Sequence, residues 1–552
     1  MDATHPAISR VAVDDFTRPG DADSAPGIRA AIAHALRCGA SEVRFAVGRY
    51  RLQSATEHYA PGAVHDAANL GDAPYKACHL HVQGARGLRL SGAVDADGHP
   101  ATVLVGENDG LNHGLLPAIL WCEDCPGLTV RDLAFTREPT YASAGVVVEH
   151  SADGITVEVF PGEPCWDGMG TYCMNRCDPR TGALRGASVT FGGGAGTVWK
   201  HRGGRLLSLA SPAVAAQVSL GEALSWHQGA RSDIQVYFGS CHGLQLTNLR
   251  TANANGLALV TEGCRDITTD RLVFRPDGQR LFTAPRDGWK LFKCSGQISV
   301  SRLEIHGVRM DGQNVHSTWL QRESDAADDS AVFRCRYALT PLSNGSTIEC
   351  WLGGELTVAT LLAWEHLGKA GDEHRLRLRF DRTLPAGPGL LAAPLCWQPE
   401  RYLCRASTFS SIAGAGHLIR GGRVTISGCT YRDLMCPGIH LGAEFGTHPE
   451  ASHATDVLIE DNTFASCGLR DRAVYDRGPG GCIATGSIGP DPAPTCAANR
   501  GIVIRGNRFS AAPVGIALRQ AREVRLEGNS FDAIGEELRS DAASTHEVTT
   551  GA

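Results

Sequence analysis

The sequence lacks long hydrophobic runs and blocks of like charge. No stretch of its 552 residues approaches the ~20 consecutive apolar residues that span a bilayer. Its 52 Lys and Arg residues against 59 Asp and Glu residues give a formal charge of -7, with no basic block. We therefore expect neither a membrane nor a nucleic acid as a partner. The first residues also lack the basic and apolar stretches of a secretory signal, so we expect a cytoplasmic protein, or an extracellular one if a signal was removed.

Paired metal-ligand motifs are also missing. The 19 cysteines are an odd number spread along the chain, which a secreted disulfide framework does not favour. The C-x2-C spacing occurs once, at Cys122 and Cys125, without a second pair or a His-x3-His partner. We expect reduced thiols, no bound metal and no other cofactor.

Glycine is abundant. It accounts for 65 of the 552 residues, about 12% against a usual ~7%, and this indicates many tight turns. A short strand pattern, approximately I-x-V-x-x-N-x-F, recurs along the chain. Its copies start at Leu88, Leu128, Leu244, Ile267, Ile298, Val424, Val457, Ile502 and Val524. Ile267 follows Leu244 by 23 positions, a length that fits one coil of a parallel β-solenoid better than a strand, helix and strand.

Two residue types recur at fixed places in this pattern. Cysteines stand three or four positions before the strand, and asparagines stand at the polar corner after it. They are Cys125, Cys241, Cys264 and Cys294, and Asn462, Asn507 and Asn529. Stacked coils place like residues in columns, so these should form ladders. The fold class we expect is all-β, a right-handed parallel β-helix with two inserted antiparallel β-barrel subdomains.

The repeat fails in two places, and these define the expected domains. Alternating strands without the coil pattern fill both gaps and predict the inserted barrels. The domains are an N-terminal cap with an amphipathic helix and the first coils (1–137), a first barrel (138–220), central coils (221–316), a second barrel (317–400), C-terminal coils (401–535) and a disordered tail (536–552).

Two acidic residues stand 24 positions apart in the central coils. Asp287 and Asp311 should therefore lie on the same outer face of adjacent coils. Two carboxylates on the same face of adjacent coils are the arrangement that glycoside hydrolysis requires. Nearby aromatic and polar residues suit a sugar-binding site, either by packing on a ring or by bonding hydroxyls. These candidates are Trp226, His227, Arg280, Lys290, Asn314, His316 and Trp319.

The segments 287–298 (DGWKLFKCSGQI) and 310–319 (MDGQNVHSTW) resemble glycoside hydrolase family 110, the exo-acting α-1,3-galactosidases. The resemblance implies a parallel β-helix and an inverting mechanism that releases terminal α-linked galactose. It also implies that Asp287 and Asp311 act as the general acid and the general base. Two positions depart from the family pattern: Met310 stands where an aspartate is typical, and Lys290 stands where a histidine is expected.

A later segment, 436–457, offers further carboxylates. Glu444 and Glu450 are candidates for hydroxyl contacts or for the acid missing at position 310, and a solvated loop between coils explains them equally well. We expect an oligosaccharide or glycoconjugate as substrate, and an oligomer is compatible with the sequence. Alternatives are another β-helix enzyme, acting on a different terminal glycoside or as a polysaccharide lyase, or a non-catalytic carbohydrate-binding solenoid.

Overall fold

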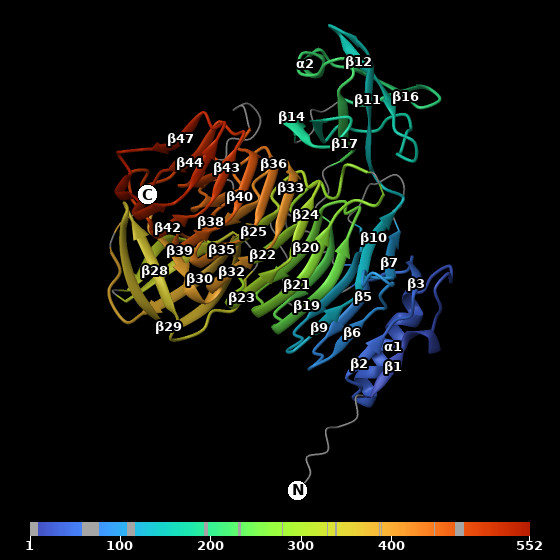
Figure 1. Ribbon diagram of the computed structural model, residues 1–552. Helices are drawn as coiled ribbons and strands as arrows, with labels where there is room; N and C mark the ends of the chain where they lie inside the picture. The colour runs from blue at the N-terminus through green and yellow to red at the C-terminus, as the bar shows by residue number, and fades with distance from the viewer. Residues whose placement is uncertain are drawn as a thin grey trace.

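The computed structural model shows a parallel β-helix that carries two inserted antiparallel units (Figure 1). It describes residues 9–57, 77–107, 116–191, 197–229, 233–278, 280–327, 329–336, 339–371, 373–385, 387, 389–446, 448–469 and 480–551. The first eight residues of the expected cap lie outside these ranges. Within them, no helix is long and apolar enough to cross a membrane.

Each coil contributes strands to two long sheets. The first sheet contains β1 (Arg10–Ala12), β2 (Glu42–Arg44), β3 (Gly48–Leu52), β6 (Arg89–Ser91), β7 (Thr102–Glu107), β9 (Thr129–Arg131), β10 (Leu133–Glu138), β19 (His242–Thr251), β21 (Arg265–Phe274), β23 (Ser295–Ser301), β24 (Glu304–His306), β32 (Pro399–Arg405), β33 (Thr408–Ile412), β35 (Gly422–Ser427), β36 (Thr430–Leu434), β39 (Ala454–Glu460), β40 (Thr463–Cys467), β42 (Asn499–Arg505), β43 (Arg508–Ser510), β45 (Ala521–Glu527), β46 (Ser530–Asp532) and β48 (Thr545–Gly551).

The second sheet carries the candidate site. It contains β4 (Thr56–Glu57), β5 (Ala77–Gln83), β8 (Ala118–Glu123), β18 (Ile234–Gly239), β20 (Leu257–Glu262), β22 (Trp289–Phe292), β25 (Gln313–Thr318), β34 (His417–Ile419), β37 (Ile439–Leu441), β41 (Ile483–Thr485), β44 (Val514–Leu518) and β47 (Glu536–Ser540), with β38 (Glu450–Ala451) paired to β25. Except for β4 with β5 and β38 with β25, its pairings are parallel.

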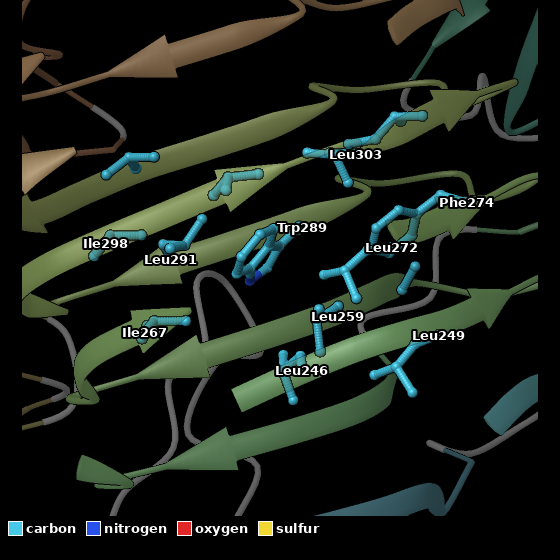
Figure 2. Close-up of a cluster of buried hydrophobic side chains, with 14 of the residues drawn as sticks. Leu246, Leu249, Leu259, Ile267, Leu272, Phe274, Trp289, Leu291, Ile298 and Leu303 are labelled. Carbon is cyan, nitrogen blue, oxygen red and sulfur yellow. The ribbon is translucent and has the colours of Figure 1, made fainter. Parts of the chain in front are cut away.

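The interior of the solenoid is built from columns of like side chains. Leu244 pairs with Ile267, and Ile267 with Ile298, so that inward residues stack from coil to coil (Figure 2). The cysteine column is confirmed as buried, and none of the 19 cysteines, all of which lie in the described residues, forms a disulfide. A further column of stacked rings runs through Phe409, Tyr431, Phe464, Phe509 and Phe531, and the last four of these stand at the final position of the recurring strand pattern.

The asparagine ladder is also confirmed, with one difference. Asn462 Nδ2 donates to Asn507 Oδ1 at 3.0 Å, and Asn507 Nδ2 donates to Asn529 Oδ1 at 3.1 Å. The tight bend itself lies one residue earlier, where Asp461 has a φ of 54° and Gly506 a φ of 62°. The asparagine side chains therefore bond the corner together, while a neighbour supplies its left-handed conformation.

A short helical cap covers the N-terminal end of the solenoid. The helix α1 (Ala25–Cys38) buries Ile28, Ile32 and Ala35 against the first strands, next to the 3-10 turn η1 (Val13–Asp15). It ends at Gly39, whose φ of 69° is the left-handed conformation that glycine adopts readily. Such a cap shields the apolar interior of the first coil.

The first inserted unit is an open antiparallel sheet, not the closed barrel expected. Its strands run in the order β14 (Leu184–Phe191), β13 (Cys173–Cys177), β17 (Ala223–His227), β11 (Ala142–Ser151), β12 (Gly154–Val159), β16 (Leu206–Ala210) and β15 (Lys200–Gly203). In the described residues the edge strands β14 and β15 do not pair with each other. The short helix α2 (Pro212–Ala215) contributes to its hydrophobic core, and β17 extends the unit past residue 220.

The second inserted unit is a closed barrel. Its strands are β26 (Leu320–Ala327), β27 (Ser330–Cys335), β30 (Glu373–Phe380), β29 (Glu355–Ala370), β28 (Thr347–Leu352) and β31 (Leu391–Pro394), followed by the turn η2 (Leu395–Trp397). The barrel interrupts the chain but not the stack, because β23 pairs directly with β32 on its far side.

The expectation of a disordered tail from residue 536 is wrong. Strand β47 pairs in parallel with β44, and β48 pairs with β45, so these residues complete one more coil. Their polar composition reflects their place at the end of the stack, where few side chains are buried and backbone pairing supplies the order.

Candidate active site

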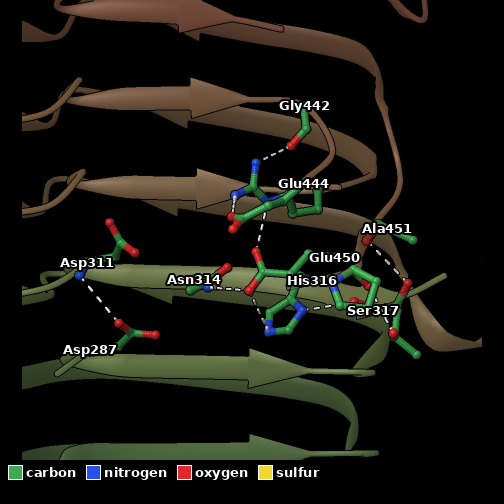
Figure 3. A network of polar contacts seen from close by, with 12 residues as sticks. Asp287, Asp311, Asn314, His316, Ser317, Gly442, Glu444, Glu450 and Ala451 are labelled. Carbon is green, nitrogen blue, oxygen red and sulfur yellow. Dashed lines mark hydrogen bonds and ion pairs between the residues drawn. The ribbon is translucent and has the colours of Figure 1, made fainter. Parts of the chain in front are cut away.

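Asp287 and Asp311 occupy equivalent corners of adjacent coils, just before β22 and β25. The backbone of Gly288 donates to the carbonyl oxygen of Asp311 at 3.0 Å, which sets the two corners one coil apart. The N–H of Asp311 points to Asp287 Oδ1 at 3.4 Å (Figure 3). The structure thus brings the two carboxylates together, with Asp287 5% and Asp311 0% exposed.

A column of glycines directs these carboxylates outward. Gly288 and Gly312 follow Asp287 and Asp311, Gly416 follows Ala415 on the next coil, and their missing side chains would point into the solenoid. A Cβ on Gly288 would lie 2.8 Å from the carbonyl oxygen of Gly312, and one on Gly312 would lie 2.7 Å from that of Gly416. The neighbouring coils therefore require glycine here, and each preceding residue projects to the outer face.

The third coil of this column holds Asp311 in place. The backbone N–H of Ala415 donates to Asp311 Oδ1 at 2.8 Å. A Cβ on Gly414 would lie 2.4 Å from the same oxygen, so only glycine leaves room for the carboxylate in this position. Sequence reasoning missed both residues, although the recurring x-Gly dipeptide at the corners is a signal that could have shown them.

A second polar cluster lies further along the same outer face. The side chain of Arg420 reaches Glu444 Oε2 and Glu450 Oε2, each at 2.9 Å, and it also donates to the carbonyl oxygen of Gly442. Asn314 Nδ2 donates to Glu450 Oε1 at 3.2 Å (Figure 3). Glu444 and Glu450 are thus buried in an ion-paired cluster, which differs from the solvated loop that was one reading of the sequence.

His316 completes this cluster as a neutral ring. Its Nε2 lies 3.7 Å from Glu450 Oε1, and its Nδ1 lies 2.8 Å from the carbonyl oxygen of Ser317. Burial lowers the pKa of His316 to about 3, against the raising influence of Glu450. His316 therefore serves near neutral pH as a hydrogen-bonding group and not as a charged acid.

Lys290 lies between the aspartate pair and the cluster around Arg420. It stands in register with Asn314 on the adjacent strand, facing outward between the inward residues Trp289 and Leu291. Its Nζ lies 5.9 Å from the ring centre of Phe292, which in turn packs on His316. The outer face of β22 and β25 thus presents a row of Asp, Lys, Asn and His side chains.

Other candidates lie elsewhere in the molecule. Trp226 is buried in the core of the first insertion, where it packs on Trp199. His227 stacks on Phe282 at 5.4 Å, and Arg280 lies 3.9 Å from Glu163, so both join that insertion to the solenoid. Trp319 follows Asp311 by eight residues of mostly extended chain, which places its backbone up to ~26 Å away.

Arg420 is the main residue of the cluster that the sequence did not reveal. It follows β34, and its backbone N–H donates to the carbonyl oxygen of Val315, so it stands beside His316 on the next coil. The only local signal is a charged residue directly after an apolar strand. The second barrel separates Arg420 from His316 in sequence, and this conceals their proximity.

The comparisons with known proteins point to carbohydrate chemistry among the relatives. No protein-family model matches the chain. The alpha-1,3-galactosidase A of Bacteroides fragilis (strain YCH46) is 24% identical over 275 residues, covering 48% of this chain and 44% of the relative. The alpha-1,3-galactosidase A of Bacteroides thetaiotaomicron is 22% identical over 263 residues, covering 46% of each. The matches thus span less than half the length of these curated relatives.

Two solved structures that match most of this chain share little sequence with it. The A-module of mannuronan C-5 epimerase AlgE6 from Azotobacter vinelandii is 12% identical, with a TM-score of 0.43 over 98% of this chain and 99% of that one. A mutant tailspike protein of the Escherichia coli bacteriophage HK620, in complex with a pentasaccharide, is 13% identical, with a TM-score of 0.38 over 98% of this chain and 65% of that one.

Proposed function

We propose that this protein is an exo-acting glycoside hydrolase that releases terminal α-linked galactose with inversion. The observation that carries the proposal is the pair of aspartates on adjacent coils, within segments that resemble family 110. The similarity to the curated galactosidases supports the same class of reaction. Its substrate would be an oligosaccharide or a glycoconjugate.

The two carboxylates would divide the work of an inverting reaction. One, protonated at the start, would donate its proton to the glycosidic oxygen as the bond to the anomeric carbon breaks. The other would accept a proton from a water molecule that attacks that carbon from the opposite face. Backbones one coil apart lie at ~4.8 Å, and diverging side chains can widen this to the ~6.5–9.5 Å usual for inverting pairs.

The cluster beyond the pair would bind the sugar. Lys290, Asn314 and His316 project from the two strands that follow the acids, β22 and β25, and so can present donors and an acceptor to sugar hydroxyls. Arg420 neutralises Glu444 and Glu450 and thereby fixes the acceptors that orient Asn314. These residues would be positioned by strands, which hold a site more rigidly than loops.

The deciding experiment identifies the anomer released first. Proton NMR would follow incubation with a panel of α- and β-linked terminal galactosides and other hexosides. We expect β-galactose to appear first from an α-galactoside, before mutarotation. Release of α-galactose would mean retention and would contradict the assignment of the aspartate pair.

Met310 favours a second candidate, which is an enzyme of the same class acting on a different terminal glycoside. The residue stands where the family pattern has a further aspartate, next to Asp311. Turnover of another hexoside in the panel, with galactosides unaffected, would support this candidate over the first.

A further inference from the structure

A cavity of about 330 Å³ opens where the second barrel meets the C-terminal coils. Its walls include Gln321 and Arg334 from the barrel and Phe445 and Pro449 from the loop after β37, with Trp319 between the two. We call it the barrel-edge cavity. Its volume lies within the range of small-molecule sites, and a smaller cavity of about 30 Å³ adjoins it.

One wall of the barrel-edge cavity is aromatic. The rings of Trp319 and Phe445 stack with their centres 5.7 Å apart and their planes 13° from parallel. Phe445 is half-buried, so its ring is the more accessible of the two. A flat apolar wall of this kind packs well against the apolar face of a pyranose ring.

Two buried polar atoms beside this wall lack a partner. Trp319 is 3% exposed, and its indole Nε1 has no hydrogen-bond partner in the described part of the chain. His453, which lines the smaller cavity with Trp319, has an Nδ1 in the same situation. Other buried nitrogens of the described residues share this property, among them Trp199 Nε1 and Trp226 Nε1, so the choice of ligand rests on the walls of the cavity.

The barrel side of the cavity supplies fixed polar groups. Arg334 Nη1 donates to Glu373 Oε2 at 3.0 Å, and Arg334 Nη2 donates to Gln321 Oε1 at 3.2 Å. These bonds hold the planar groups of Arg334, Glu373 and Gln321 in place while leaving further donor and acceptor positions on each. An aromatic wall that faces fixed polar groups is suited to a polyol.

We propose that the barrel-edge cavity is a saccharide-binding site separate from the Asp287–Asp311 pair. The choice of a saccharide rests on the proposed function, whereas the cavity and its aromatic wall do not. The site lies at the far end of β25 from the acids, so a sugar held there would be several residues away from a terminal sugar at the pair. It would anchor a distant part of a glycan or hold a second chain.

Fluorine NMR of the protein labelled with 5-fluorotryptophan tests this proposal. The chain has nine tryptophans, and Trp319→Phe identifies the signal of Trp319 by its loss. We expect galactose, methyl α-galactoside or a longer galactoside to shift that signal in a saturable manner. The signal of Trp364, which packs in the barrel away from the cavity, should stay unchanged. No shift of the Trp319 signal with any saccharide in the panel would overturn the proposal.

Two further variants separate this site from the acid pair. Phe445→Leu removes the accessible ring and should weaken saccharide binding about tenfold. Asp311→Asn should leave the shift of the Trp319 signal unchanged. If Asp311→Asn abolishes the shift and Phe445→Leu does not affect it, the sugar binds only at the pair. If the shift persists in a protein that cleaves no glycoside, the binding site stands and the proposed hydrolase activity fails.

Discussion

Asp287 and Asp311 are held by backbone groups, so their amide variants can keep the same position. An Asn at 311 still offers an oxygen to the N–H of Ala415. We expect Asp287→Asn and Asp311→Asn each to lower kcat at least ~10²-fold, the usual effect of losing a general acid or base. Asp270→Asn is the matched control, because Asp270 pairs with Arg302 on another face. Equal activity in all three variants would exclude the pair from catalysis.

Gly414 tests the placement of Asp311 without changing any charge. A methyl group at this position would lie 2.4 Å from Asp311 Oδ1 and 2.5 Å from the carbonyl group of Met310, so Asp311 would have to move by roughly 1 Å together with the backbone before it, a displacement that can cost ~10²-fold in rate. Gly414→Ala should therefore lower kcat/KM strongly in steady-state assays. Gly229→Ala is the control, because a Cβ there meets no atom within 4 Å. A fully active Gly414→Ala variant would show that the position of Asp311 does not matter.

The asparagine ladder shows how single elements stabilise the stack. Asn507 accepts from the backbone N–H of Asn462 at 3.0 Å and donates to the carbonyl oxygen of Ile459 at 2.9 Å, all in the buried corner. Asn507→Ala leaves these groups without partners and should lower the free energy of unfolding by ~1–3 kcal/mol in urea titrations. Asn529→Ala, at the half-buried end of the ladder, should cost less. Equal losses would contradict this account of the corner.

The coils and their ladders could be predicted from sequence because each coil repeats the same pattern of apolar and corner residues. Apolar residues alternate along a strand, and a cysteine or an asparagine marks the same corner in successive coils. Asp287 and Asp311 could be paired for the same reason, since a separation of 24 positions corresponds to one coil. Periodicity thus predicts what stacks on what.

The remainder depended on contacts that have no period. Whether β14 and β15 meet to close the first insertion depends on strands at its two edges, which no local pattern specifies. Arg420, directly after β34, pairs with Glu450 in the short strand β38, and Asn314 contacts Glu450 although the whole second barrel separates them in sequence. The tail was misread because its polar residues pair through their backbone. The sequence therefore predicted the coils and the aspartate pair better than the polar cluster around Arg420.

The whole molecule should lose stability in mild acid. Burial lowers the pKa of five histidines from 6.5 to about 3 or about 4, and these are His79, His306, His316, His417 and His453. Below about pH 6.5 the unfolded chain binds protons that the folded chain excludes. The stabilising contribution is complete above that pH and declines as the pH falls towards 4, by up to ~1.4 kcal/mol per histidine and pH unit.

Urea unfolding midpoints measured from pH 8 to pH 4.5 would check this expectation. We expect a plateau above about pH 7 and a steady fall below pH 6.5. The exposed His201 provides the control, because His201→Gln should leave the slope unchanged. A midpoint that stays constant down to pH 4.5 would show that these rings accept protons inside the fold.

The glycine column gives the candidate site a fixed pitch. The residue before each of these glycines projects from the outer face, and successive residues of this kind are separated by one strand spacing along the axis of the solenoid. Asp287 and Asp311 occupy two of these positions, and Ala415 occupies the next. The distance between functional groups is thus set by the main chain before any side chain is chosen. A protein built in this way can gain, lose or exchange a reactive group at one of these positions while the spacing of the other outward-facing residues stays the same.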